Sequence, residues 1–134
     1  MQILVFFTIL TIFASINADF KEEITELVKE INKAVETEDH QKIAGFFEES
    51  ASFHDCLANR RKEELVEFVE FGKIEFGRIL AISEVDGSNS TFSLRTTTLF
   101  SEGDGEIEWI LKKNEDGNGT SYRISKGHEI CLGF

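Results

Sequence analysis

The sequence predicts an α+β fold in which three helices from the N-terminal half pack on a curved, mostly antiparallel sheet. Three observations predict it. Apolar residues recur at three- and four-residue steps in the first half, they alternate with polar residues in the second half, and turn sequences rich in Gly, Asn and Asp separate the later segments. A length of 134 residues favours one domain.

The three helices are expected over residues 19–36, about 40–49, and 61–71. Asp19 and Asp39 stand at the first two starts, where a carboxylate caps free backbone N–H groups. The apolar faces comprise Phe20, Ile24, Leu27, Val28, Ile31 and Val35 in the first helix, Ile43, Phe46 and Phe47 in the second, and Leu65, Phe68 and Val69 in the third.

Five strands are expected around and after the third helix. "ASFHDC", residues 51–56, is short and has no helical period, and "LANRR" after it is expected to turn the chain. The turn sequences "DGSN", "EGDG" and "EDGNG" separate the later runs. The alternation of these runs is typical of an antiparallel meander with one buried face, over residues 73–85, 90–101, 106–114 and 121–133.

The first 18 residues have the pattern of a secretory signal peptide. They carry no charged side chain, are almost continuously apolar from Ile3 to Phe13, and end in small residues that suit cleavage after Ala18. We therefore expect residues 19–134 to be one secreted domain with no membrane association, because no long apolar run follows. The net charge of −11 repels phosphate backbones, which argues against a nucleic acid partner and favours solubility or a cationic partner.

Asp55 has two interpretations. Alternation places it on the same side as Phe53, which is expected to face inward, and an apolar neighbourhood would raise the pKa of its carboxyl, as a general base needs. Alternatively, it caps the following turn through backbone N–H groups. His54 is expected to face the opposite way, so the two adjacent side chains do not form a dyad.

The order of elements and the residues at this strand end resemble the nuclear transport factor 2-like superfamily, which includes ketosteroid isomerase, the polyketide cyclases and scytalone dehydratase. The likeness is carried by "AVETEDHQKIAGFFEESASFHDCLANRRKEELVEFV" (34–69) and "WILKKNEDGNGTSYRISKGHEI" (109–130). Small secreted nematode members resemble the chain still more. The resemblance implies a cone-shaped fold with an apolar pocket, and a first strand that lies beside the last.

The resemblance also implies site residues. Asp55 falls on the general base of the isomerases, and His128 on the last strand would assist it unless a bulge at Gly127 turns its side chain away. The two positions that hold oxyanion donors in the isomerases correspond to apolar residues here, Ile31 and Trp109, so we do not expect efficient isomerase activity. The apolar pocket is expected to be lined by Ile31, Phe47, Phe53, Phe68 and Trp109.

Cys56 and Cys131 are the two cysteines, and a secreted protein with two usually joins them. In the resembled fold their strands are neighbours, which suits a disulfide; a reactive thiol is the alternative. Asn89 and Asn118 begin glycosylation sequons in predicted turns. No spacing typical of a metal site or a cofactor motif is present.

Three functions remain open from the sequence. The first is a secreted, non-enzymatic protein whose Phe-rich pocket binds a small apolar ligand. The second is an isomerase or dehydratase that uses Asp55 as general base. The third is an extracellular interaction module that forms a homodimer through its exposed sheet face.

Overall fold

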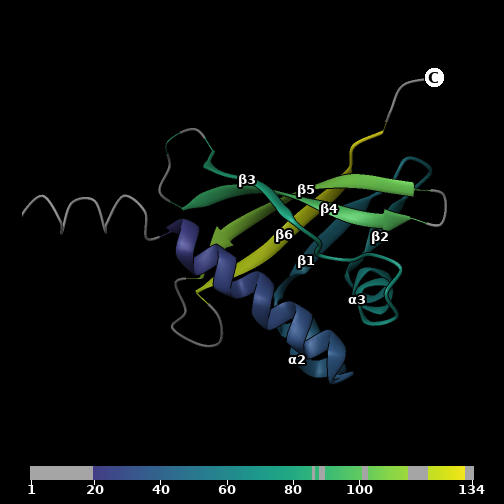
Figure 1. Ribbon diagram of the computed structural model, residues 1–134. Helices are drawn as coiled ribbons and strands as arrows, with labels where there is room; N and C mark the ends of the chain where they lie inside the picture. The colour runs from purple at the N-terminus through teal and green to yellow at the C-terminus, as the bar shows by residue number, and fades with distance from the viewer. Residues whose placement is uncertain (1–19, 86, 88–89, 101–102, 115–120, 132–134) are drawn as a thin grey trace, which may run out of the picture.

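The computed structural model describes residues 20–85, 87, 90–100, 103–114 and 121–131 (Figure 1). The helices of this part are residues 20–36, α2 (His40–Gly45) and α3 (Lys62–Glu70). The strands are β1 (Phe47–His54), β2 (Asn59–Arg61), β3 (Ile79–Glu84), β4 (Thr91–Phe100), β5 (Gly103–Lys113) and β6 (Tyr122–Glu129). The predicted α+β fold is confirmed: three helices accompany a six-stranded, mostly antiparallel sheet.

The strands form one sheet in the order β2-β1-β6-β5-β4-β3. The predicted meander is confirmed, because β3, β4, β5 and β6 pair antiparallel in chain order. β1 lies parallel to β6, so the first strand is beside the last, as the resemblance implied. β2, which pairs antiparallel with β1, was not predicted; its three residues are mostly exposed and carry no apolar alternation that would distinguish them from a turn.

The predicted boundary between the second helix and the first strand was wrong. The helix was expected to reach residue 49, but α2 ends at Gly45 and β1 already begins at Phe47. Glycine weakens a helix, and the adjacent Phe46 and Phe47 fit the inner side of either element. Both side chains are buried, so the apolar pattern was read correctly although its secondary structure was not.

A second boundary differs after α3. Strand was predicted from residue 73, yet β3 begins at Ile79, and the segment before it is irregular. This segment still contributes buried side chains from Ile74 and Phe76. Gly77 packs its backbone against β4, where an added Cβ would lie 2.4 Å from Thr97 Oγ1, so the close approach requires glycine.

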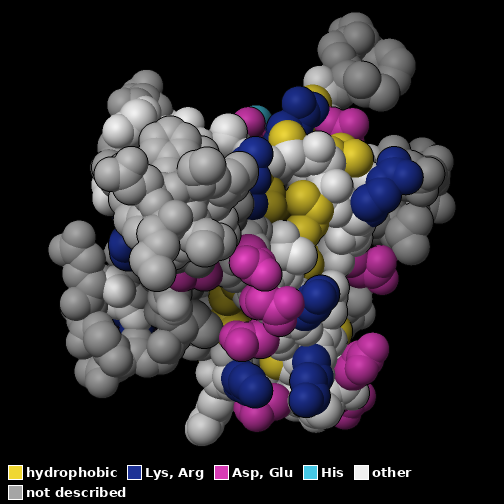
Figure 2. All heavy atoms as spheres, turned by 60° about the vertical axis from the view of Figure 1, so that its left-hand side comes forward, with side chains coloured by type: hydrophobic (Ala, Val, Ile, Leu, Met, Phe, Trp, Pro, Cys, Tyr) yellow, Lys and Arg dark blue, Asp and Glu magenta, His cyan; other side chains and the backbone are white. Residues whose placement is uncertain are grey.

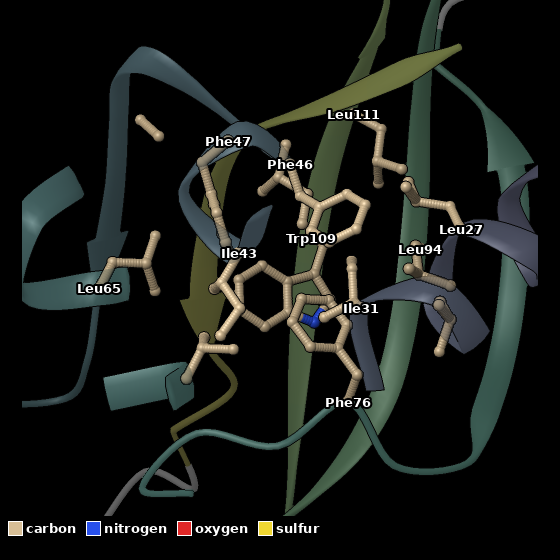
Figure 3. Packing of buried hydrophobic residues seen from close by; sticks show 14 of the residues in the cluster. Leu27, Ile31, Ile43, Phe46, Phe47, Leu65, Phe76, Leu94, Trp109 and Leu111 are labelled. Atoms are coloured by element: carbon tan, nitrogen blue, oxygen red, sulfur yellow. The ribbon is translucent and has the colours of Figure 1, made fainter. Parts of the chain in front are cut away.

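The core lies between the helices and one face of the sheet, with Trp109 of β5 at its centre (Figure 3). Trp109 is fully buried; its ring stacks on Phe76 with centroids 4.3 Å apart and lies 5.7 Å from the ring of Phe53. Its indole Nε1 donates a hydrogen bond to Oγ1 of buried Thr96, 3.2 Å away. The polar atom of the largest core side chain is therefore satisfied inside the core.

Gly127 of β6 makes room for this ring. A Cβ at that position would lie 2.5 Å from Trp109 Cε3 and 3.0 Å from Phe53 Cδ2. Any side chain there would displace one of the two aromatic rings. The aromatic side chains therefore fill the centre of the core only because position 127 has no side chain.

Cys56 and Cys131 form a disulfide, as predicted, with their Cα atoms 5.8 Å apart. It joins the segments that follow β1 and β6 across a sequence separation of 75 residues. Such bonds persist in oxidising compartments. Among the described residues, none of the helices is long and apolar enough to cross a bilayer.

The surface carries charges of both signs. Figure 2 brings the left-hand side of Figure 1 forward and shows acidic and basic side chains interspersed, with hydrophobic atoms exposed between them. On the first helix, Lys29 Nζ and Glu26 Oε1 form an ion pair 3.2 Å apart. The acidic net charge is thus accompanied by local pairing on the helix surface.

Candidate functional site

A pocket opens where β1 and β6 end, beside the disulfide. Its volume is about 270 Å³, and we call it the Phe68 pocket. It is lined by Phe53, Asp55, Cys56, Leu57, Phe68, Lys73, Ile74 and Glu129. These residues come from the end of β1 and its turn, the C-terminal end of α3 and the segment that follows it, and the last residue of β6.

The walls of the Phe68 pocket are mainly apolar. Phe53 and Ile74 belong to the core and close the inner side of the pocket. Phe68 is half-buried, and its ring forms part of the pocket wall. Leu57 stands at the outer edge with 94% of its surface exposed. A fully exposed leucine beside a partly exposed aromatic ring provides apolar surface for a ligand to cover.

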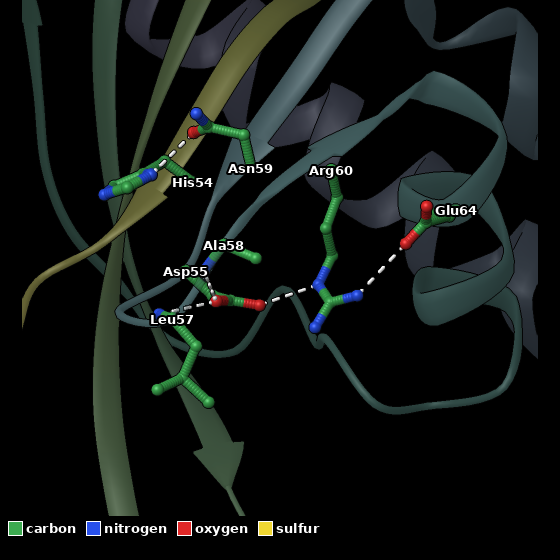
Figure 4. Close-up of polar contacts among 7 residues, drawn as sticks. All are labelled: His54, Asp55, Leu57, Ala58, Asn59, Arg60 and Glu64. Atoms are coloured by element: carbon green, nitrogen blue, oxygen red, sulfur yellow. Dashed lines mark hydrogen bonds and ion pairs between the residues drawn. The ribbon is translucent and has the colours of Figure 1, made fainter.

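Asp55 caps the turn that joins β1 to β2 (Figure 4). Its Oδ1 accepts hydrogen bonds from the backbone N–H groups of Leu57 and Ala58, both at 2.8 Å. Its Oδ2 accepts from Arg60 Nε at 2.7 Å. Both carboxylate oxygens are therefore engaged, and the turn-capping interpretation of Asp55 is confirmed.

The expected rise in the pKa of Asp55 was wrong. Burial by itself raises the pKa of this carboxyl, but the hydrogen bonds from Leu57 and Ala58 and the guanidinium of Arg60 together outweigh burial and hold the pKa below its ordinary value. Asp55 is thus a stabilised carboxylate, and a weak base. The sequence pattern shows the apolar neighbour Phe53, but it does not show that the turn brings the cation Arg60, five residues further on, against Asp55.

Arg60 connects the turn to α3. Besides Asp55, its guanidinium contacts Glu64 Oε2 through Nη1 at 3.0 Å. Its Cζ also lies 4.4 Å from the centroid of the Phe68 ring. Asp55, Arg60, Glu64 and Phe68 therefore form one connected group at the edge of the Phe68 pocket.

His128 does not approach Asp55. β6 has one extra residue, Ser125, because the adjacent residues Ile110 and Leu111 of β5 pair with Lys126 and Ile124. This bulge reverses the alternation, so that Gly127 faces the core and His128 faces outward, where it is exposed. The predicted pair of Asp55 and His128 is therefore not formed.

His54 lies on the outward face, opposite in orientation to Phe53, as predicted. It is the register partner of His128 on the neighbouring parallel strand. Its Nδ1 is 2.6 Å from Asn59 Oδ1, a contact that spans the β1–β2 hairpin. The histidines of this region therefore lie on the other side of the sheet from the Phe68 pocket.

The five residues predicted to line a pocket divide into two groups. Phe53 and Phe68 line the Phe68 pocket. Ile31, Phe47 and Trp109 are buried in the aromatic core, and none of them lines the Phe68 pocket. The sequence identified these positions as apolar. It did not show which of them would pack against one another and which would face a cavity.

Lys73 is a pocket residue that the sequence analysis missed. It follows Gly72, which has a positive φ of 75° at the end of α3. The N–H of Gly72 bonds to the carbonyl of Val69, and that of Lys73 to the carbonyl of Phe68 at 2.8 Å. These two bonds define a Schellman motif, and a glycine two residues after a helix is the signal that could have found it.

Other predicted sites have different outcomes. Within the described ranges, no three His, Cys, Asp or Glu side chains are grouped so as to hold a metal ion. Asn89 and Asn118 lie outside the described residues, as does the predicted signal peptide, so glycosylation and cleavage stay predictions.

Comparisons with known proteins agree with this architecture. The family model of the NTF2-like domain matches residues 21–126. We found no match to this sequence among curated proteins. Among solved structures, the chain is similar to an NTF-2 like protein of unknown function from Silicibacter pomeroyi, with a TM-score of 0.62 and 15% identity, covering 85% of this chain and 97% of that one.

Two further structures show how far this likeness extends. A second NTF-2 like protein of unknown function, from Shewanella oneidensis, has a TM-score of 0.59 and 16% identity, with 81% and 97% of the two chains covered. A de novo designed protein with a curved β-sheet reaches 0.56 at 15% identity, over 83% and 99%. These likenesses establish the fold alone. Since the family model spans most of the sequence, the chain belongs to the NTF2-like domain family.

Proposed function

We propose that this chain is a secreted, non-enzymatic NTF2-like protein that binds a small apolar ligand in the Phe68 pocket. The observation that carries the proposal is the pocket itself, a cavity of about 270 Å³ with apolar walls and a few polar groups at its edge. Ligand sites are typically concave and mostly apolar, with a small number of placed polar groups. The predicted signal peptide and the disulfide support secretion.

The chemistry around Asp55 supports binding over catalysis. A general base must be free to accept a proton, whereas both oxygens of Asp55 accept hydrogen bonds and Arg60 holds it in the charged form. The positions that correspond to oxyanion donors carry Ile31 and Trp109, both fully buried in the core. Tyr122 packs its ring against Phe92 at 5.3 Å and is not part of the pocket lining.

Binding of an uncharged apolar probe tests this function. We expect isothermal titration calorimetry to detect 1-decanol binding to the unmodified protein. Phe68→Ala removes the ring of the pocket and should abolish that heat, while Phe71→Ala should leave it unchanged. Phe71, three residues further on, is 71% exposed and does not line the Phe68 pocket, so it is a matched control.

Circular dichroism must show that both variants are folded. Absence of decanol binding to the unmodified protein, or equal losses in the two variants, would contradict the proposal.

A second candidate function is homodimerisation through the outward sheet face, and the charge order along β5 favours it. Glu106 and Glu108 occupy one half of that face, Lys112 the other, and the half-buried Ile110 lies between them. Lys126 of β6 is the register partner of Ile110 and adds to the basic half. Two copies related by a two-fold axis near Ile110 would set acidic halves against basic halves.

Sedimentation velocity measures this candidate. The unmodified protein should sediment as a dimer, Lys112→Glu with Lys126→Glu should sediment as a monomer, and Lys33→Glu on the exposed surface of the first helix should have no effect. A monomer at all concentrations of the unmodified protein would exclude this candidate and leave ligand binding unaffected.

A further inference from the structure

We propose that the ligand of the Phe68 pocket is an amphipathic anion, whose apolar body covers the Phe68 ring and whose carboxylate pairs with Nζ of Lys73. This inference rests on the proposed function, because it names the class of ligand for the same pocket. It is drawn from the placement of Lys73, the engagement of the other charges around the pocket, and the environment of the Phe68 ring.

The backbone holds Lys73 at the pocket. The Schellman motif at the end of α3 fixes the N–H of Lys73 on the carbonyl of Phe68, and the positive φ of Gly72 allows the tight turn. The side chain then returns across the helix end, so that Nζ lies 5.1 Å from the centroid of the Phe68 ring. Lys73 is thus positioned beside the aromatic wall by its own helix terminus.

Within the described ranges, no carboxylate is paired with the charge of Lys73. Asp55, which also lines the pocket, is bonded through both oxygens to the turn and to Arg60. A ligand that covers Phe68 would desolvate the ammonium of Lys73, and an anionic group on the ligand would offset that cost.

The Phe68 ring discriminates between ligand charges. Two cations already contact it, Arg60 with Cζ at 4.4 Å and Lys73 with Nζ at 5.1 Å. A cationic head group at this ring would meet both of them, whereas an anionic one would be attracted. The remaining lining carboxylate is Glu129, which is half-buried at the end of β6. It is the group that a cationic ligand would select, so the two classes can be separated by experiment.

Three probes with the same ten-carbon chain test the inference: decanoate, 1-decanol and decyltrimethylammonium. Decanoate and decyltrimethylammonium are titrated calorimetrically below their critical micelle concentrations and 1-decanol below its solubility limit, all at physiological ionic strength, so that monomeric ligand is measured. We expect decanoate to bind about five- to tenfold more tightly than decanol, as one partly solvated charged hydrogen bond provides. Lys73→Gln should reduce that preference to less than about twofold.

Lys33→Gln removes the same charge from an exposed position on the first helix and is the matched control. It should leave the preference for decanoate intact, which separates a local contact from the effect of net charge. Equal affinity for decanoate and decanol would overturn the assignment to Lys73 while leaving the apolar ligand standing. Tightest binding of decyltrimethylammonium would overturn it in favour of Glu129. Failure of all three probes to bind would overturn the proposed function itself.

Discussion

The Trp109 core and the Phe68 pocket use the same kinds of residue for different purposes. Around Trp109, rings from β1, β5 and the segment before β3 contact one another and fill the space. At the Phe68 pocket, the ring of Phe68 faces cations and solvent. An aromatic-rich sequence therefore does not by itself specify a cavity; the cavity arises where aromatic side chains lack aromatic partners.

The two regions also differ in what holds them together. The core depends on close packing of buried side chains, whereas the pocket walls are joined by the disulfide, the Asp55–Arg60 ion pair and the Schellman motif. Changes to one region should therefore have limited effects on the other. Variants in each region test that separation.

Removing the disulfide should have the largest effect on stability. Cys56→Ser with Cys131→Ser should lower the free energy of unfolding by about 4–5 kcal/mol on the chain-entropy model, because the bond closes a loop across a separation of 75 residues. Denaturant unfolding measures the loss. Under native conditions decanol affinity should fall, since Cys56 lines the pocket, while Trp109 fluorescence should still report a buried ring. Unchanged decanol affinity in a folded double variant would show that the pocket does not need this bond.

Gly127→Ala should disturb the core. The new Cβ would lie 2.5 Å from the Trp109 ring, and such overpacking costs about 1–3 kcal/mol. Gly45→Ala is the control, because its Cβ would meet nothing within 4 Å and it lies in α2. Thermal unfolding should therefore show a lower Tm for the first variant only. Equal Tm values would mean that the core around Trp109 is looser than described.

Asp55→Asn should lower the free energy of unfolding by about 1 kcal/mol, because the contact between residue 55 and Arg60 loses its ionic character. Glu64→Gln, at the more exposed end of the same network, should cost less than about 0.5 kcal/mol. Chemical unfolding of both variants gives the comparison. A larger loss for Glu64→Gln would contradict the account of this network.

The acid stability of Asp55→Asn gives a separate measurement. Folding lowers the pKa of Asp55 from its ordinary value of 3.8, so its carboxylate adds stability above that value. The contribution is lost as the pH falls through the lower pKa of the folded state. Asp55→Asn should therefore show a smaller loss of stability than the unmodified protein when the pH is lowered from about 5 to about 2. Identical acid profiles would show that Asp55 is not stabilised as a carboxylate.

The smallest expected effect is on catalysis. Purified protein should not isomerise an unconjugated steroid enone at a useful rate, and Asp55→Asn should leave the background unchanged. An absorbance assay for the conjugated product measures both. Rapid turnover that disappears in Asp55→Asn would replace the binding function with the enzymatic one.

Sequence reasoning reached the fold because regular patterns encode it. The alternation of Phe92, Leu94 and Thr96 on β4 identified a buried face, and all three side chains are buried. The disulfide followed from two cysteines in a chain with an apparent signal peptide, together with the neighbouring strands that the resemblance implied.

The candidate site was less predictable because it depends on irregularities. One bulged residue, Ser125, reversed the orientation of His128. Asp55 acquired its environment from Arg60, which a turn brings back beside it. The separation of core from pocket depends on side-chain packing that apolar alternation does not encode. Lys73 differs from these residues, because its position directly after Gly72 at a helix end could have been predicted from the sequence.

Methyl NMR during titration with 1-decanol distinguishes a ligand in the pocket from a ligand in the core, because it reports on both regions in one sample. We predict that the methyl signals of Leu57 and Ile74, which line the Phe68 pocket, shift with increasing ligand. The methyl signals of Ile31 and Leu94, which are buried in the aromatic core, should stay in place. Shifts at Ile31 and Leu94 with none at Leu57 and Ile74 would contradict the account, because they would place the ligand in the core that we describe as filled.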